Sequence, residues 1–173
     1  MLWKLRLLWY RLDKAALTFG LFCSLVVGAL VFAFTGATSY REAKQAAVRD
    51  FHAKSLDCLA RNVYYEARGE PTAGQYAVAE VTMNRKASPR YPKTVCEVVY
   101  QKEAFSWTEL RVLEPPAGDA WVRAVMVAED VYYQRRPRML HPTVIHFHAT
   151  YVQPDWSAER QRVARIGKHI FYR

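Results

Sequence analysis

An uncharged run of 23 residues near the N-terminus constrains this chain more than any other feature of its sequence. The run spans residues 15–37 and reads "AALTFGLFCSLVVGALVFAFTGA". A bilayer core about 30 Å thick needs roughly 20 residues of helix, so the run is long enough to cross a membrane. We therefore predict a transmembrane or signal-anchor helix at 15–37, preceded by a cytoplasmic basic tail at 1–14.

The charges before this span predict its orientation. Residues 1–14 carry four Lys or Arg and a single acidic residue, Asp13. Because positive flanks stay in the cytoplasm, we expect a single pass through an inner membrane with residues 38–173 in the periplasm. A cleaved signal peptide is the alternative, since "TGA" at the end of the run resembles a cleavage site. The run exceeds the roughly 7–15 apolar residues of a signal peptide, which favours an uncleaved anchor.

The predicted span is only weakly apolar. Eleven of its 23 residues are Gly, Ala, Ser or Thr, and small side chains bury less apolar area in lipid than Leu or Ile. Small residues also help membrane helices to pack. Two interpretations stay open: a permanent anchor, and a span that can leave the bilayer. In a permanent anchor, Cys23 is a small apolar side chain that fills space in the membrane. In a span that has left the bilayer, Cys23 is a thiol able to attack a disulfide.

The remaining composition predicts one folded domain with an anionic partner. The chain has 173 residues, 51% hydrophobic, with a formal net charge of +9. Charge of this sign suits nucleic acid, lipid head groups or an acidic wall polymer, and the predicted topology excludes nucleic acid. In an oxidising compartment Cys58 and Cys96 are natural disulfide partners. We expect a monomer.

Several helices are expected first. Residues 38–54 read as a polar linker helix, and Ser55 as the N-cap of the next helix, which a Gly and a Pro end. Thr72 and Thr94 each stand three residues before a Gln or Glu, which is capping-box spacing. Residues 120–135 form the last expected helix, with an apolar stripe at helical spacing.

Strands are expected only near the C-terminus. "TVIHFHATYV", residues 143–152, is β-branched and aromatic and alternates as a strand does. "RVARIGKHIFYR" ends the chain and predicts two strands around Gly167 and Lys168. Helices followed by a small antiparallel sheet indicate an α+β domain over residues 55–173.

Glu66 is the candidate catalytic residue. It follows Val63 by three positions and Leu59 by seven, so it lies on or beside the buried stripe of its helix. Burial and the negative end of the helix both disfavour a carboxylate, so we expect a raised pKa. A protonated acid near neutral pH is what cleavage of a glycosidic bond needs. The alternative is a solvated Glu, or one paired with Arg61 or Arg68.

Several collinear blocks between residues 56 and 173 resemble the catalytic domain of the spore-cortex-lytic, SleB-type cell-wall hydrolases. The blocks are "CLARNVYYEARGEPTAGQYAVAEVTMNR", "YPKTVCEVVYQ", "AFSW", "HFHATYVQPDW" and "IGKHIFYR". The resemblance implies a lysozyme-like, mainly helical α+β domain that cuts peptidoglycan glycan strands. The family's catalytic Glu matches the first carboxylate of "YEARGE", which is Glu66.

The resemblance also implies lytic transglycosylase chemistry. One Glu acts as acid toward the glycosidic oxygen and then as base toward the sugar's own 6-hydroxyl, which closes a 1,6-anhydro ring. This route needs no second carboxylate, no metal and no cofactor, and it fits a sequence without an obvious second catalytic acid. Hydrolysis of the muramidase type remains the alternative outcome.

Other residues are candidates for binding the sugar. Glu70, beyond the helix break, is a helper or a capping group. Ser106 offers a hydroxyl to a groove, or to water. Tyr64, Tyr65 and Trp107 offer stacking surfaces, with core packing as the alternative for at least one tyrosine.

Two histidines and an Asn–Arg pair complete the candidates. His146 and His148 alternate on the predicted strand and therefore face the same way, which is also metal-ligand geometry with Asp155 as a third ligand. The family resemblance favours a groove role without metal. Asn84 and Arg85 match a family block, and we expect them to hold the end of the preceding helix.

The front of the chain suggests how such an enzyme is deployed. A membrane span in place of a wall-binding module resembles the signal-arrest-release endolysins of phages that infect Gram-negative bacteria. That resemblance implies an exported enzyme, held at the membrane and freed when the membrane potential collapses. The alternatives are a permanently anchored bacterial wall-remodelling enzyme, a zinc-dependent wall peptidase using His146 and His148, and a non-catalytic wall-binding protein.

Overall fold

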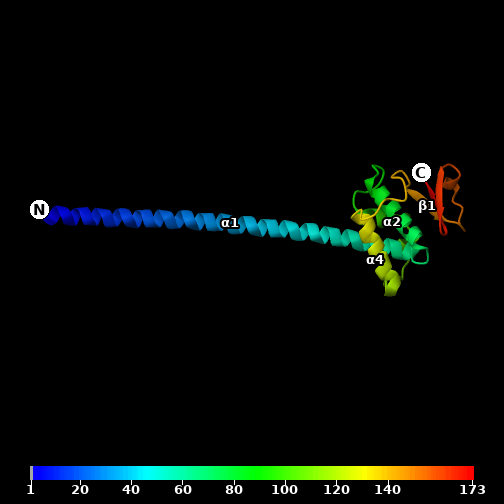
Figure 1. Ribbon diagram of the computed structural model, residues 1–173, viewed down its shortest axis with the longest axis horizontal. Helices are drawn as coiled ribbons and strands as arrows, with labels where there is room; N and C mark the ends of the chain where they lie inside the picture. The colour runs from blue at the N-terminus through cyan, green and yellow to red at the C-terminus, as the bar shows by residue number, and fades with distance from the viewer. Residues whose placement is uncertain (1) are drawn as a thin grey trace. The chain divides into compact units, whose positions relative to one another are not determined.

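The computed structural model describes residues 2–173, with side chains for residue 14 and residues 16–173. The other side chains of the predicted basic tail therefore lie outside the description. The chain divides into two compact units, Met1–Arg49 and Asp50–Arg173. One helix, α1 (Leu2–Ala67), contributes residues to both units (Figure 1).

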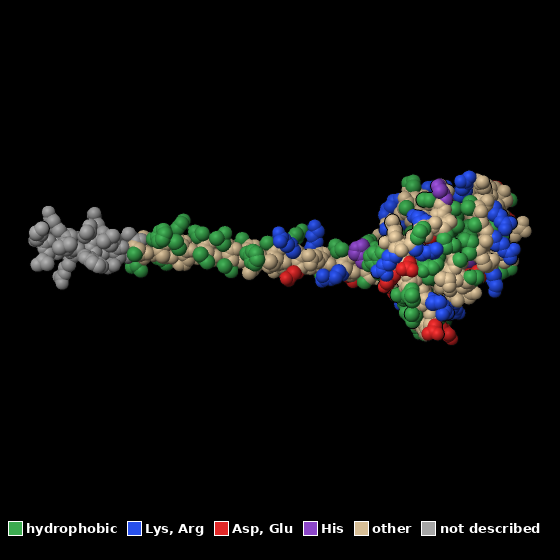
Figure 2. Space-filling model, in the orientation of Figure 1, with side chains coloured by type: hydrophobic (Ala, Val, Ile, Leu, Met, Phe, Trp, Pro, Cys, Tyr) green, Lys and Arg blue, Asp and Glu red, His purple; other side chains and the backbone are tan. Residues whose placement is uncertain are grey.

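The first unit, Met1–Arg49, contains the apolar part of α1. Large apolar side chains between Leu17 and Phe34 are exposed along it (Figure 2). Among the described residues, one helix is long and apolar enough to cross a membrane, and it contains the predicted span. Hydroxyl groups in this stretch donate to the preceding turn, for example Ser24 Oγ to the Gly20 carbonyl at 2.6 Å. Such bonds lower the cost of placing a hydroxyl in lipid.

The prediction that Ser55 caps a new helix is wrong. Residues 38–54 are helical and α1 continues through Ser55 to Ala67 without a break. The linker contains neither Gly nor Pro, so nothing in it ends a helix. Ser55 is instead buried in the second unit.

Three shorter helices pack around the last turns of α1 in the second unit: α2 (Thr72–Ala87), α3 (Val95–Val99) and α4 (Gly118–Tyr132). Leu59 and Val63 of α1 lie at the centre of the core that these helices share. The capping box at Thr94 forms as predicted. The box at Thr72 does not, because Pro71 occupies the N-cap position.

The strands come last and form one antiparallel sheet, which confirms the predicted α+β order. They are β1 (His146–Ala149), β2 (Arg162–Ile166) and β3 (His169–Tyr172), in the order β1-β3-β2. Two short 3-10 helices, Ser106–Glu109 and Asp155–Ser157, lie in the connections. The β2–β3 turn contains Gly167, whose φ of 58° favours glycine.

Helix α2 lies between the two parts of the core. Ala79 packs with the helices, whereas Ala77 and Val81 pack against Phe171 of the sheet and Val144. The sheet is thereby held beside the end of α1, where Glu66 lies.

Two further links fix this arrangement. Cys58 and Cys96 form a disulfide that ties α1 to α3. Asn84 donates to the carbonyls of His141 and Val144, and Arg85 Nε donates to the Ile145 carbonyl at 2.8 Å. The expectation that Asn84 and Arg85 hold the end of the first helix is therefore wrong, because their bonds hold the segment that leads into β1.

Candidate active site

Glu66 lies in the last turn of α1, one residue before the helix ends. Its side chain is half-buried, and burial raises its pKa to about 7, while the nearby Arg85 cation lowers it. Among the side chains that the structure describes, none donates a hydrogen bond to this carboxyl group. Because no donor offsets the burial of its charged form, this carboxyl group retains a proton up to about pH 7.

The two arginines that offered an alternative role for Glu66 are engaged elsewhere. Arg61 pairs with Asp57 one turn earlier, with Nε and Oδ2 2.8 Å apart. The Arg68 guanidinium lies over the Tyr64 ring, 5.0 Å from its centroid. Glu66 therefore forms an ion pair with neither Arg61 nor Arg68.

A long groove passes Glu66. It consists of three adjoining hollows of about 600, 450 and 220 Å³. The first two share Arg85, Ser106 and His148, and the last two share Tyr65, Glu66 and His169. A groove of connected hollows suits a segment of polymer better than a small compact ligand.

Tyr65, Ser106 and Trp107 all line the hollow that contains Glu66. Tyr65 and Trp107 stack on each other at 4.6 Å. Trp107 is only 6% exposed, and its Nε1 donates to Asn62 Oδ1 at 2.9 Å. Its main role is therefore in the core, whereas Ser106 is exposed at the groove.

Glu70 lines the smallest of the three hollows, which forms the end of the groove opposite the largest hollow. Its Oε2 accepts a hydrogen bond of 2.7 Å from the backbone N–H of Lys168 in the β2–β3 turn. Glu70 thus fastens the start of α2 to the sheet, which suits a structural helper better than a second reacting acid.

His146 and His148 lie on β1 and both contact Trp156, with ring centroids 5.5 and 5.6 Å away. The predicted common face is therefore correct. Nδ1 of His148 donates to the Ala149 carbonyl, which can only accept, so Nε2 accepts from the Tyr172 hydroxyl. Both ring nitrogens of His148 have protein partners, which favours a groove role over metal ligation.

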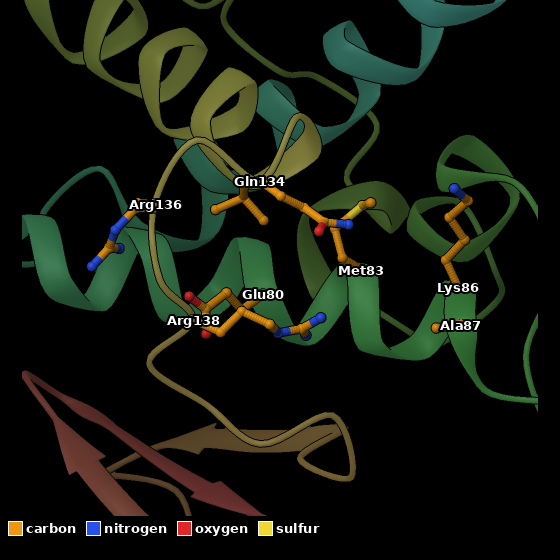
Figure 3. Close-up of a pocket in the computed structure, with 8 residues that line it drawn as sticks. Glu80, Met83, Lys86, Ala87, Gln134, Arg136 and Arg138 are labelled. Carbon is orange, nitrogen blue, oxygen red and sulfur yellow. The ribbon is translucent and has the colours of Figure 1, made fainter.

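A separate hollow of about 210 Å³ lies between α2 and the segment that follows α4 (Figure 3). Glu80, which is buried there, accepts hydrogen bonds from the backbone N–H groups of Met139 and Leu140. Glu80 is thus occupied in holding this segment. It shares no hollow with Glu66.

The sequence analysis missed four residues that line the groove: Arg85 as a groove residue, Tyr151, Trp156 and His169. Tyr151 is 83% exposed although it is a large aromatic residue. The run "HATYVQPDW" around it contains two aromatics in an otherwise turn-rich stretch, and that pattern was the available signal. His169 and Arg85 carried no such signal, because only the fold brings them to Glu66.

Comparison with known proteins shows the family. The family profile described as Cell Wall Hydrolase matches residues 69–172, and the chain belongs to this family. Spore cortex-lytic enzymes of Halalkalibacterium halodurans and Bacillus subtilis are 34% and 31% identical over 67% and 70% of the chain. The chain spans only 34% and 38% of the length of these two relatives.

Solved structures show the same fold. The catalytic domain of the Bacillus cereus SleB protein aligns with a TM-score of 0.52 at 28% identity, over 69% of this chain and 89% of the other. The catalytic domain of a germination-specific lytic transglycosylase, SleB from Bacillus anthracis, aligns with a TM-score of 0.54 at 27% identity, over 69% and 93%. The SleB-type resemblance is thus confirmed. The matched family range begins after Glu66, so the role of Glu66 rests on its geometry.

Proposed function

We propose that this chain cleaves the glycan strands of peptidoglycan by lytic transglycosylation, with Glu66 as the acid and base. The observation that carries the proposal is a half-buried carboxyl group, with a pKa of about 7, in the wall of a long groove. Similarity to a spore cortex-lytic enzyme and to a germination-specific lytic transglycosylase supports the same reaction class.

In the first step, protonated Glu66 gives its proton to the glycosidic oxygen. The bond from that oxygen to the anomeric carbon breaks, and positive charge develops on the sugar ring. Glu66 becomes a carboxylate, and the Arg85 cation, which lowers its pKa, stabilises this charge.

In the second step, the Glu66 carboxylate takes the proton of the sugar's 6-hydroxyl. The oxygen attacks the anomeric carbon and closes a 1,6-anhydro ring, which returns Glu66 to its protonated form. Because attack is intramolecular, no second carboxylate is needed to activate water. Besides Glu66, the acids that line the three hollows of the groove are Glu70 and Glu103. Glu70 is bonded to Lys168, and Glu103 lies in the wall of the hollow that does not contain Glu66.

The test uses the full chain in detergent, added to purified peptidoglycan whose turbidity is followed. We expect Glu66→Gln to lower the clearing rate at least about 100-fold, the usual contribution of a general acid. Glu114→Gln, an exposed carboxyl outside the groove, is the matched control and should clear at the parental rate. Equal rates for Glu66→Gln and the parent would refute the catalytic role. Loss of the parental rate on adding chelator would instead support a zinc peptidase.

We propose further that residues 15–37 anchor the enzyme in an inner membrane, with 1–14 cytoplasmic, 38–54 a linker and 55–173 the periplasmic cleaving domain. The apolar helix and the disulfide between Cys58 and Cys96 support this topology, since disulfides persist in oxidising compartments. The small residues of the span favour a releasable anchor of the phage-endolysin type over a permanent one.

Release can be tested at Gly20 and Gly28. A Cβ at either position meets no atom within 4 Å, so larger side chains fit on the helix surface. Changing both glycines to Leu increases the apolar area in lipid and should hold the chain in the membrane. We expect delayed lysis and chain retained in the membrane fraction after depolarisation. Unchanged timing and fractionation would indicate a permanent anchor.

A further inference from the structure

The larger end of the groove, beyond Ser106, has Arg85 and Lys102 in its wall. We call it the His146 end, and its lining includes Arg85, Tyr91, Lys102, Glu103, His146 and Trp156. The pKa of His146 is lowered to about 4, first by burial and then by the charges of Arg160, Arg85 and Arg90. Arg90 and Arg160 are therefore close enough to His146 to act on this end of the groove. The acid in its wall, Glu103, is highly exposed and pairs with Lys102 at 3.5 Å.

Arg85 is a buried cation that lacks a constant counter-charge. It is 7% exposed, and its hydrogen bonds go to the uncharged carbonyls of Ile145 and Ala104. No ion pair among the described side chains includes it. Glu66, its acidic neighbour, is protonated below about pH 7 and then carries no charge. The Arg85 guanidinium lies over the Phe105 ring at 4.9 Å and the Tyr91 ring at 5.6 Å, but neither contact neutralises its charge. A buried charge that is not neutralised is costly, and a guanidinium has more donors than these two carbonyls use.

Arg160 is incompletely satisfied at the same end of the groove. Its guanidinium lies over the Trp156 ring, 5.7 Å from the centroid. Its Nε is buried and has no hydrogen-bond partner. Trp156 lines the hollow and also contacts His146, so Arg160 is linked to the wall of the hollow through its contact with Trp156.

We propose that the His146 end of the groove is a carboxylate-binding subsite, which recognises an acidic substituent of the glycan strand. The inference rests on the proposed function, because it places a glycan in this groove. Arg85 and Arg160 supply the charge, and Trp156 supplies the surface against which the sugar lies. Peptidoglycan offers such a carboxylate from two sources: the lactyl group of the muramic sugar, and the peptides attached to it.

The test measures binding to the full chain carrying Glu66→Gln, in detergent, so that ligand is not consumed. Three soluble ligands are compared by calorimetry: strand fragments with peptides, the same fragments with peptides removed, and the latter with each lactyl carboxyl converted to a methylamide. If the lactyl carboxylate is recognised, we expect the methylamide ligand to bind about tenfold more weakly than its free-acid parent, the usual effect of losing a charged hydrogen bond; if a peptide carboxylate is recognised, we expect the same loss on removing the peptides. Equal affinity for all three ligands would overturn the proposal.

The ligands also distinguish the two sources. If the lactyl carboxylate is recognised, the peptide-free fragments bind best. If a peptide carboxylate is recognised, the fragments with peptides bind best and methylamidation of the peptide-free strands has no further effect.

Variants then connect the preference to these residues. We expect Arg160→Gln to reduce the tenfold preference to about twofold or less, and Arg160→Lys to retain part of it, because Lys keeps the charge. Arg90→Gln, at an exposed position, should weaken the preference without disturbing the core. Arg123→Gln on α4 is the charge-matched control outside the groove and should keep the full preference. The same loss with Arg123→Gln would mean that net charge alone attracts the strand, and would overturn the subsite.

Failure of the proposed function is distinguishable from failure of the subsite. If strands bind with the carboxylate preference but the parent chain does not cut them, the reaction is wrong and the subsite stands. If the parent cuts strands with peptides, peptide-free strands and methylamide strands at equal rates, the subsite is wrong and the reaction stands.

Discussion

Replacing Glu66 by Gln should make the stability of the folded domain less dependent on pH. The pKa of Glu66 rises from an ordinary value of 4.5 to about 7 on folding, because burial disfavours its charged form. The folded state thus holds the Glu66 proton more tightly than the unfolded state does. This contribution is fully present below pH 4.5 and is lost as the pH rises through about 7.

The size of the effect follows from the two pKa values. A tenfold difference in proton affinity corresponds to about 1.4 kcal/mol, so a pKa of about 7 instead of 4.5 amounts to about 3 kcal/mol. Glutamine is uncharged at every pH and has the same shape. We therefore expect Glu66→Gln to gain about 3 kcal/mol of stability relative to the parent between pH 4 and pH 8.

The assay is chemical denaturation of the full chain in detergent across this pH range, with the disulfide kept oxidised. Glu114→Gln, at an exposed position, is the control and should follow the parent at each pH. A difference between Glu66→Gln and the parent that stays constant from pH 4 to pH 8 would refute the idea that burial keeps Glu66 protonated.

Three further outcomes are expected. Arg85→Gln should raise the Glu66 pKa and move the alkaline limb of the pH–rate profile to higher pH, whereas Arg85→Lys should not; a limb that stays in place would contradict the coupling. Changing Cys58 and Cys96 to Ser should lower the free energy of unfolding by about 4 kcal/mol, because the disulfide closes a loop of 38 residues; an unchanged denaturation midpoint would refute this. Gly167→Ala should cost about 1–3 kcal/mol, because of its positive φ and because a Cβ would meet the Glu70 carboxylate. Gly69→Ala has open space and is the control for the same measurement.

Local patterns predicted much of the fold. The stripe of Leu59 and Val63, the capping box at Thr94 and the alternation of His146 and His148 each depend on residues close in sequence. Local sequence signals gave a wrong prediction where two of them favoured different structures at the same residue. Ser55 has the chemistry of an N-cap, yet the uninterrupted helical sequence before it kept α1 continuous.

The groove shows what local patterns cannot predict. Arg85, Trp156 and His169 come from α2, a connection and β3, and only packing brings them to the same groove as Glu66. The raised pKa of Glu66 was predicted from its place on a buried stripe, whereas the influence of Arg85 on it depends on a contact across the fold.

The central claim is that Glu66 alone supplies the proton and then recovers one from the sugar itself. Mass spectrometry of peptidoglycan digested by the full chain in water enriched in heavy oxygen tests this claim most directly. We predict anhydro-muropeptides without heavy oxygen from the parent, and no such products from Glu66→Gln. Reducing ends that carry heavy oxygen, or anhydro products from Glu66→Gln, would contradict it.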